Sequence, residues 1–327
     1  MSADLKEKVY QLFLLGTEGG GYKSALAQGL GGVIFFTKDI ITAEQFKSLV
    51  SEVKSLAKLP PFLSIDQEGG RVERTENIHG RKKYLSAKYA YEKGVKYLEQ
   101  QTKEIAKELL TYGINLNFAP CIDVNTNPAN PIIGERAFSA NVEDVIKAEA
   151  IVSSIYRQNG IVPCVKHFPG HGDANSDSHL TLPQIDLSLG EMEKFHIKPF
   201  KSAIENGAEM VMVAHLHCTC FEKDEIPTSL SKNAITYLRE VLAFEGVVIS
   251  DDMVMKGVAS FGQLEACVMA LKAGMNMFIY RDSNPQTLEM IEDIYNRALM
   301  DKDLRLQVEK SYNKIIELKK KYIDWSN

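Results

Sequence analysis

The residues best suited to proton transfer lie in residues 166–183, which read KHFPGHGDANSDSHLTLP. Three histidines, two aspartates and a lysine fall within these eighteen residues, which follow neither a helical nor a strand period. Ordering so polar a loop costs conformational entropy, which favours a binding or catalytic loop over a passive connector. A solvated turn around Gly-His-Gly is the alternative. The apolar run at residues 162–165 favours the functional interpretation, because it predicts a buried strand that ends at this loop.

Charged and polar side chains also follow other apolar runs of the chain. One such residue alone could be a helix N-cap, but several together are better explained by a shared pocket. Parallel strands bring residues of this kind to the carboxyl edge of a barrel, where α/β enzymes have their active sites. The residues are Asp66, Asp123, Lys166, His167, His215, His217, Asp251, Asp252 and Arg281.

Apolar runs alternate with helical patterns along the whole chain. The runs that predict strands are centred near Leu12, Val33, Leu63, Leu116, Val165, Met212, Val248 and Phe278. Near-continuously apolar strands that alternate with helices indicate a parallel sheet covered on both faces. Eight such units in 327 residues favour an α/β fold with a single (β/α)8 TIM-like barrel over a doubly wound sheet.

Several helix boundaries are also predicted. We expect a short helix over residues 5–12 and another that begins with a capping box at Thr42 and runs to about residue 58. Glycine tolerates the left-handed conformation that ends a helix. Five helices are therefore predicted to end at Gly113, Gly160, Gly207, Gly246 and Gly274. We expect residues 1–327 to form one catalytic domain, with helices between residues 284 and 322 packed around the outside of the barrel.

The composition is that of an ordinary soluble globular protein. Hydrophobic residues make up 45% and charged residues 25% of the chain, which excludes a disordered or collagen-like protein. The net charge of −5 argues against a nucleic-acid partner, and no apolar run is long enough to cross a bilayer. Five cysteines, an odd number, and the absence of a signal-peptide pattern predict a reducing, cytoplasmic environment. We expect a monomer that binds neither nucleic acid nor membrane.

Five motifs occur in the same order as in a known family. They are DQEGGRVxR at residues 66–74, NFAPxxDV at 117–124, GERxF at 134–138, KHFPGHGDxxxDSH at 166–179 and SDDMxMKG at 250–257. On these motifs the chain resembles the single-domain β-N-acetylglucosaminidases of glycoside hydrolase family 3, the NagZ type of bacterial cell-wall recycling. The fourth motif is highly specific, whereas the shorter ones would mean little alone.

The resemblance implies a retaining exo-hydrolase that releases terminal β-linked N-acetylglucosamine from muropeptides or chitooligosaccharides, with no metal and no organic cofactor. It implies Asp251 as the nucleophile, His179 as the general acid/base and Asp177 as the partner of His179. The residues implied to hold the sugar hydroxyls and the 2-acetamido group are Asp66, Arg74, Arg136, Lys166 and His167.

The chemistry of retaining hydrolysis agrees with these roles, because it needs a carboxylate nucleophile and a proton donor. Asp177 can hydrogen-bond one ring nitrogen of His179 and favour the imidazolium near neutral pH. Adjacent residues of a strand point to opposite sides, so only one of Asp251 and Asp252 can face the barrel mouth. The residues themselves leave that choice open, and the resemblance favours Asp251. We expect Asp252 to cap a loop or pair with a cation.

Three other functions remain open from the sequence. A phosphorylase could use the same site, because a histidine donor lacks the negative charge that would repel phosphate. A metal-dependent barrel hydrolase could use His215 and His217 together with residues of the loop, His171, Asp173 and His179. This is disfavoured because such metal sites usually draw their ligands from several strand ends, whereas three of the chain's histidines share one glycine-rich loop. An inactive sugar-binding barrel would require a broken catalytic set, yet all three catalytic candidates are present. The sequence does not specify the aglycone.

Overall fold

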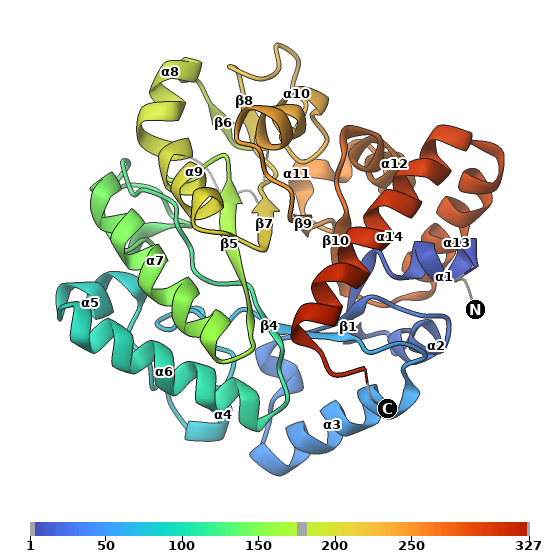
Figure 1. Cartoon of the computed structure of the whole chain (residues 1–327), viewed down its shortest axis with the longest axis horizontal. Coiled ribbons are helices and arrows are strands. Elements are labelled where there is room, and N and C mark those ends of the chain that lie inside the picture. Colours follow the sequence, from blue (N-terminus) through green and yellow to red (C-terminus); the bar gives the residue numbers. More distant parts are fainter. Residues whose placement is uncertain (1–3, 175–181, 326–327) are drawn as a thin grey trace.

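The computed structural model describes residues 4–174 and 182–325, and their central feature is a closed barrel of eight strands (Figure 1). The strands are β1 (Phe13–Glu18), β2 (Gly32–Phe35), β3 (Phe62–Ile65), β4 (Leu116–Asn117), β5 (Val162–Phe168), β7 (Met210–Val213), β9 (Val247–Asp252) and β10 (Met277–Asp282). All neighbours pair in parallel, and β1 closes the barrel against β10. The predicted (β/α)8 TIM-like fold and all eight predicted strands are confirmed.

The strands are buried because side chains fill the barrel and helices cover its outside. Every residue of β2, β3, β5 and β7 is buried. At the closing seam, the rings of Phe13 and Phe278 stack with their centroids 5.5 Å apart. These continuous apolar runs made the strands recognisable in the sequence.

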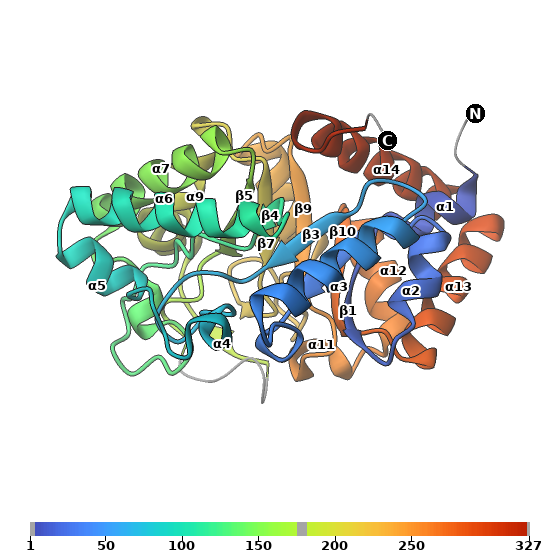
Figure 2. The same ribbon diagram turned by 90° about the horizontal axis from the view of Figure 1, so that it is seen from below.

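Helices surround the barrel and the loops between strands carry short additional elements (Figures 1 and 2). The longer helices are α3 (Ala43–Leu56), α6 (Val95–Thr111), α7 (Val142–Gln158), α9 (Lys198–Glu205), α12 (Gln263–Ala273), α13 (Pro285–Met300) and α14 (Lys302–Tyr322). The shorter α-helices are α1 (Leu5–Tyr10), α2 (Tyr22–Ala27), α4 (Glu76–His79), α5 (Ala87–Glu92), α8 (Leu189–Glu191), α10 (Lys232–Thr236) and α11 (Lys256–Ala259). The remaining elements are the 3₁₀ turns η1 (Thr37–Asp39) and η2 (Gly134–Arg136), the π-helical turns η3 (Met192–Ile197) and η4 (Tyr237–Val241), and the strand pair β6 (Gln184–Ile185) and β8 (His217–Cys218).

The predicted start of α3 is confirmed, and one of the two hydrogen bonds of the predicted capping box is present. Thr42 Oγ1 accepts a hydrogen bond from the N–H of Gln45 at 3.2 Å. The Gln45 side chain accepts from the N–H of Ile41, not from that of Thr42, so the reciprocal bond of a capping box is absent here. The helix ends at Leu56, slightly before the predicted boundary.

Four of the five predicted glycine helix ends are confirmed, and the fifth is wrong. Gly113, Gly160, Gly207 and Gly274 have positive φ values, between 73° and 115°. Gly246 does not, and the left-handed residue after η4 is instead Ala243, with φ 54°. Gly246 is required for a different reason, because a Cβ there would lie 2.5 Å from the carbonyl oxygen of Glu209.

The last helix covers the end of the barrel where the strands begin. The Lys319 amine lies 5.1 Å from the ring centre of Phe62, at the start of β3, and donates to Gln11 Oε1 at 2.8 Å. Asn276, just before β10, donates to Ser311 Oγ of α14 at 3.1 Å. Figure 2 shows α14 on the opposite side of the barrel from α4 and α11. The tail was expected on the outside of the barrel, but α14 lies across this end, which leaves the carboxyl ends of the strands as the accessible mouth.

None of the helices in residues 4–174 and 182–325 combines the length and the apolar character needed to span a bilayer.

Gly246 allows a direct test of the packing at this end of the barrel. We expect Gly246→Ala to lower the free energy of unfolding by about 2 kcal/mol, because the added methyl group would overlap Glu209 and the Phe244 ring. Gly190→Ala is the matched control, because nothing lies within 4 Å of a Cβ there, and a change below about 0.5 kcal/mol is expected. Urea denaturation of both variants measures the difference, and equal stability would contradict the packing role.

Candidate active site

A cavity of ≈ 500 Å³ opens among the carboxyl ends of the barrel strands. Six of the eight predicted site residues line it: Asp66, Arg74, Arg136, Lys166, His167 and Asp251. The other two, Asp177 and His179, lie outside the described residues. Of the remaining strand-end residues, Asp252 and Arg281 also line the cavity, whereas Asp123, His215 and His217 do not. The strand ends therefore converge on one pocket, as expected, although three of the predicted side chains lie behind or beside its wall.

Lys166 is the most deeply buried cation of the cavity wall. It lies within β5, two residues before the strand ends, and its Nζ donates to Asp66 Oδ1 at 2.7 Å and lies 2.6 Å from Glu68 Oε1. Burial alone would lower the pKa of Lys166, but Asp66 and Glu68 outweigh it and raise that pKa above the ordinary value. The amine is therefore a permanent positive charge beside the cavity.

Arg74 stands on the other side of Asp66. Its guanidinium lies 3.7 Å from Asp66 Oδ2 and 5.7 Å from the ring centre of Phe36. The Arg74 Nε atom is buried without a protein partner in the described residues. Asp66 therefore lies between two cations, Lys166 and Arg74, and all three side chains face the cavity.

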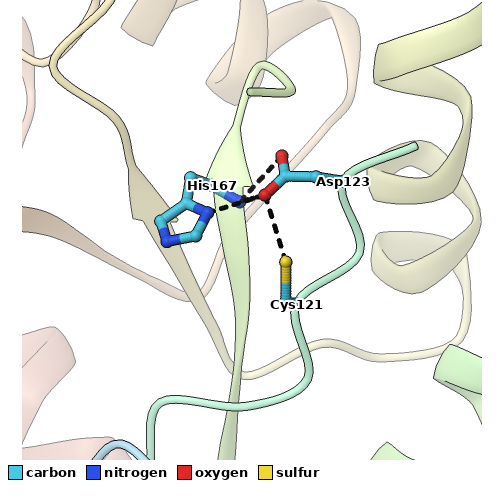
Figure 3. A group of neighbouring side chains, drawn as sticks. All are labelled: Cys121, Asp123 and His167. Carbon is cyan, nitrogen blue, oxygen red and sulfur yellow. Dashed lines mark hydrogen bonds and ion pairs between the residues drawn. The ribbon is translucent and has the colours of Figure 1, made fainter. Parts of the chain in front are cut away.

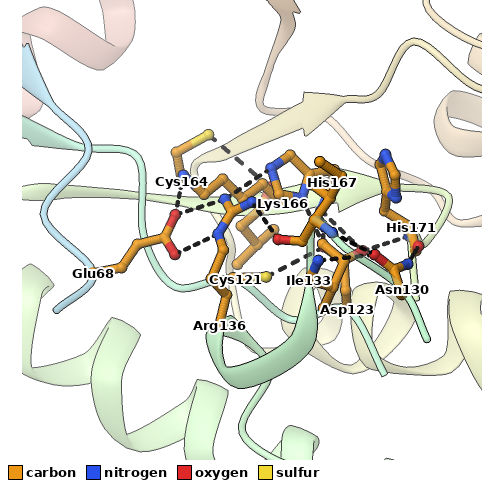
Figure 4. A network of polar contacts seen from close by, with 12 residues as sticks. Glu68, Cys121, Asp123, Asn130, Ile133, Arg136, Cys164, Lys166, His167 and His171 are labelled. Carbon is orange, nitrogen blue, oxygen red and sulfur yellow. Dashed lines mark hydrogen bonds and ion pairs between the residues drawn. The ribbon is translucent and has the colours of Figure 1, made fainter. Parts of the chain in front are cut away.

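Glu68 and Arg136 form a two-pronged ion pair next to Lys166 (Figure 4). Arg136 Nε and Nη2 donate to the two carboxylate oxygens of Glu68 at 2.9 and 2.8 Å. Burial would raise the pKa of Glu68, but Arg136 and Lys166 hold it far below the ordinary value. Arg136 Nη2 also lies 3.3 Å from His167 Nε2, which connects this pair to the next residue of β5.

His167 is held by the buried carboxylate of Asp123 (Figure 3). Its Nδ1–H donates to Asp123 Oδ2 at 2.6 Å, and the backbone N–H groups of His167 and His171 also donate to this carboxylate. Burial would raise the pKa of Asp123, but the two histidines lower it well below the ordinary value. With Nδ1 bound to Asp123, the Nε2 atom of His167 faces Arg136 as an acceptor.

Cys121, Asp123 and His167 have ligand atoms within 4.8 Å of one another, so this one group in the described part of the chain has spacing that a metal ion could bridge. Burial raises the pKa of the Cys121 thiol well above its ordinary value, and the thiol donates to Asp123 Oδ2 at 3.2 Å. A protonated thiol and an occupied Nδ1 are poor metal ligands. Hydrogen bonding therefore accounts for the arrangement.

The two histidines of the His-x-His pattern do not form a shared metal site. Both ring nitrogens of His215 are engaged, Nδ1 with Ser229 Oγ at 2.7 Å and Nε2 with the Asp252 carbonyl oxygen at 3.1 Å. His217 Nε2 contacts the Glu222 carbonyl oxygen at 3.0 Å. Neither residue lines the cavity, so the geometry does not support the metal ligation considered from the sequence.

The structure distinguishes the two aspartates at the end of β9. Asp252 forms an ion pair with Arg281 and accepts hydrogen bonds from the N–H groups of Val254 and Arg281. This is the cation pairing expected for the aspartate that is not the nucleophile. The Asp251 carboxylate accepts only from the N–H of Asp252, at 2.7 Å, among the described residues.

Asp251 is also ionised. Burial would raise its pKa, but the electrostatic influence of His167 and His215 brings the pKa of Asp251 below the ordinary value. The cavity thus contains a carboxylate that has no ion-pair partner among the described residues and shares the cavity with several cations. Such a group is available for nucleophilic attack.

Sequence reasoning did not assign a site role to Glu68 or Asp123. Glu68 lies inside the motif at residues 66–74, and Asp123 was recognised only as a strand-end residue. Both carboxylates are buried and hold the cations and the histidine of the cavity wall. The sequence signal that could have identified Glu68 is its place in a strand-end motif, between an aspartate and two glycines.

Comparison with known proteins identifies relatives of the whole barrel. The family model described as Glycosyl hydrolase family 3 N terminal domain matches residues 4–318. Beta-hexosaminidase of Methylococcus capsulatus is 34% identical over 272 residues, covering 82% of this chain and 80% of its own length. Beta-hexosaminidase A of Pseudoalteromonas piscicida is 33% identical over 269 residues, covering 76% of this chain but only 45% of its own length.

A solved structure agrees with the sequence relatives. The glycoside hydrolase family 3 beta-N-acetylglucosaminidase from Paenibacillus sp. str. FPU-7 superposes with a TM-score of 0.90 at 29% identity. The superposition covers 98% of this chain and 63% of that chain. This chain therefore spans less than two thirds of that protein.

Asp123 provides a pH-dependent test of the buried part of the site. We expect Asp123→Asn to lower the free energy of unfolding by about 2 kcal/mol at pH 7, because an amide cannot replace the charged acceptor of three N–H groups. The pKa of Asp123 is lowered in the folded protein, so its stabilisation is present above the unfolded value of about 4 and is lost as the pH falls below it. The difference between the two proteins should therefore shrink below about pH 4.

The control for this measurement is Asp186→Asn, because Asp186 is exposed and accepts a single hydrogen bond from Thr219. Its effect should stay below about 0.5 kcal/mol at every pH. A constant difference between wild type and Asp123→Asn across the acidic range would contradict the charged role of Asp123.

Proposed function

The chain belongs to glycosyl hydrolase family 3, and from this premise we propose that it is a retaining exo-β-N-acetylglucosaminidase that releases terminal β-linked N-acetylglucosamine. The expected family and the expected class, glycoside hydrolase, are confirmed by the match over residues 4–318. Relatives such as the Methylococcus protein carry the name Beta-hexosaminidase, which supports the proposed activity.

The observation that carries the proposal is the state of Asp251. It is an ionised carboxylate at the end of a rigid strand, and it faces the cavity without an ion-pair partner among the described residues. A retaining glycosidase needs such a group to attack the anomeric carbon. The neighbouring Asp252 is less suitable, because it is paired with Arg281 and burial raises its pKa.

The shape and lining of the cavity support action on the end of a sugar chain. The carboxyl ends of the strands form its mouth, and α14 covers the other end of the barrel, so the cavity is closed at its base. Asp66, Arg74 and Lys166 present carboxylate, guanidinium and ammonium groups on one wall, which suits the hydroxyls of a sugar. Met212, Met255 and Ile279 add apolar surface for the ring and the acetamido methyl group.

The proposed reaction has two steps. In the first, an Asp251 oxygen forms a bond to the anomeric carbon while the bond from that carbon to the leaving oxygen breaks, and His179 donates its proton to the leaving oxygen. In the second, water attacks the same carbon, gives its proton to His179 and releases Asp251. Asp177 would hold and polarise the His179 ring throughout. The roles of Asp177 and His179 rest on the sequence motif.

We further propose a muropeptide of cell-wall recycling as the substrate and a cytoplasmic monomer as the working form. The residues 1–327 would act as one catalytic domain, supported by the contacts between α14 and the strand beginnings described above. A chitooligosaccharide is the alternative substrate.

The product of the reaction tests the proposed function. The purified protein should release N-acetylglucosamine from a GlcNAc-anhydromuramyl substrate faster than from chitobiose, as measured by mass spectrometry. Retention requires that the first-formed product is the β-anomer, which proton NMR detects before mutarotation. The same assay in phosphate buffer should give no N-acetylglucosamine 1-phosphate. Formation of that product would show that the protein is a phosphorylase and not a hydrolase. If neither glycoside gives any product, the proposal is overturned.

The adjacent aspartates provide a matched pair of variants. Asp251→Asn should reduce kcat by at least about 10⁴-fold, because it removes the attacking group. Asp252→Asn should reduce kcat by no more than about tenfold, because its amide oxygen can still accept the backbone hydrogen bonds of Val254 and Arg281.

A fluorinated glycosyl inhibitor that traps the covalent intermediate separates the two assignments directly. Peptide mass spectrometry should locate the sugar on Asp251. Labelling of Asp252 or of Glu68 would show that the nucleophile has been misassigned, even if the overall activity is as proposed.

A further inference from the structure

Glu68 is the one carboxylate among the described cavity-wall contacts that binds both Lys166 and Arg136. Its Oε1 lies 2.6 Å from Lys166 Nζ and 2.8 Å from Arg136 Nη2, and its Oε2 accepts from Arg136 Nε at 2.9 Å. Glu68 itself does not line the cavity, whereas both cations do. We propose that Glu68 is a positioning residue that fixes the two cations in their substrate-binding geometry without touching the sugar.

The donor geometry explains why one carboxylate can direct both cations. Of the three N–H groups of Lys166, one donates to Asp66 and one to Glu68, so one remains for a ligand oxygen. Arg136 uses two N–H groups on Glu68, one towards His167 and one on the Ile132 carbonyl oxygen, and again one remains. The direction of the remaining N–H group of Lys166, and of that of Arg136, is therefore set by the contacts of the other N–H groups of the same side chain.

The same contacts reach His167. Arg136 Nη2 lies 3.3 Å from His167 Nε2, while Asp123 binds Nδ1 on the other side of the ring. If Arg136 turned away, the ring would lose its neighbour on the cavity side. Glu68 therefore influences three cavity-lining side chains: it forms ion pairs with Lys166 and Arg136, and it reaches His167 through Arg136.

Electrostatics make Glu68 necessary for keeping the cations close together. Lys166 and Arg136 both bind the same carboxylate oxygen, Oε1, so two positive charges lie side by side in a buried wall. Their mutual repulsion is strong at low dielectric, and Glu68 supplies the charge that compensates it. Glutamine at this position could accept hydrogen bonds but could not supply the negative charge.

The space behind the pair also indicates a supporting role. A small cavity of ≈ 30 Å³ adjoins Glu68 and Arg136, and Cys121, Gln101 and Tyr156 are among its lining residues. Its size suits a single water molecule with polar neighbours. Glu68 thus lines this internal cavity and not the active-site cavity, which agrees with a supporting role.

The test compares Glu68→Gln with Glu73→Gln. Glu73 is buried in the same loop and accepts hydrogen bonds from the N–H groups of Lys83 and Tyr84, but it does not contact the cavity. The assay uses an aryl N-acetylglucosaminide, and this choice of substrate rests on the proposed function. Glu68→Gln should raise KM for this substrate by roughly 100-fold, with a smaller fall in kcat. Glu73→Gln should retain the wild-type KM, and Glu68→Asp should recover part of the loss because it keeps the charge.

The pH profile provides a readout that simple damage to the fold would not change. Lys166 is faced by Asp66, Glu68, Arg136 and Asp251, and its pKa is raised by the first two. Removal of the Glu68 charge lowers the pKa of Lys166, so KM should rise at alkaline pH in Glu68→Gln, whereas in wild type Lys166 stays charged and KM should not rise for this reason. The same alkaline dependence of KM in both proteins would overturn the proposal.

Crystal structures of wild type and Glu68→Gln make the test independent of activity. The proposal requires that Arg136 Nη2 move out of hydrogen-bond distance of His167 Nε2. Unmoved cations would overturn it, and a raised KM with unmoved cations would mean that Glu68 contacts the sugar itself. If Glu68→Gln does not fold, Glu68→Asp is compared in the same way. Failure of wild type to release N-acetylglucosamine would refute the proposed function, while the crystal comparison would still decide the role of Glu68.

Discussion

The parallel pairing of β1 with β10 closes the barrel, and the shape of the cavity depends on this closure. It places residues from β3, β5, β9 and β10 around one mouth, although they are separated by up to about two thirds of the chain. Asp66 and Lys166, for example, are 100 residues apart and form a hydrogen bond of 2.7 Å. Closure of the sheet into a barrel brings Asp251, Arg74 and Lys166 to the same pocket.

Charge is distributed unequally around that mouth. One wall is a connected series of alternating charges and hydrogen-bonding groups, in the order Asp66, Lys166, Glu68, Arg136, His167 and Asp123. On the opposite strand, Asp252 is paired with Arg281. Asp251 alone among the described carboxylates that line the cavity has no ion-pair partner, so the other two carboxylates are compensated by cations and this one is left for a ligand.

The closed end of the barrel contributes to the same arrangement. Lys319 of α14 is fully buried, burial lowers the pKa of its amine well below the ordinary value, and its Nζ donates to Gln11 Oε1. Its neighbour, the ring of Phe62, starts the strand that leads to Asp66 at the other end. The helix therefore seals the base of the barrel, and ligands enter only from the carboxyl side of the strands.

The sequence by itself determined the barrel and most of the charged residues that line the cavity, because local patterns carry that information. An apolar run that ends in a charged residue predicts both a buried strand and a side chain at its carboxyl edge, as at Lys166 and Asp251. Tertiary structure alone decided which residues act together. The sequence pattern does not show which of the adjacent residues Asp251 and Asp252 faces the cavity as a free carboxylate. The ion pair between Asp252 and Arg281 distinguishes them. Gly246 resembles a helix end in sequence, but its requirement comes from Glu209, a residue distant along the chain. The importance of Glu68 depends on Arg136 and Lys166, which are 68 and 98 residues away. No local sequence pattern encodes contacts across such separations, because these contacts form only when the barrel has closed.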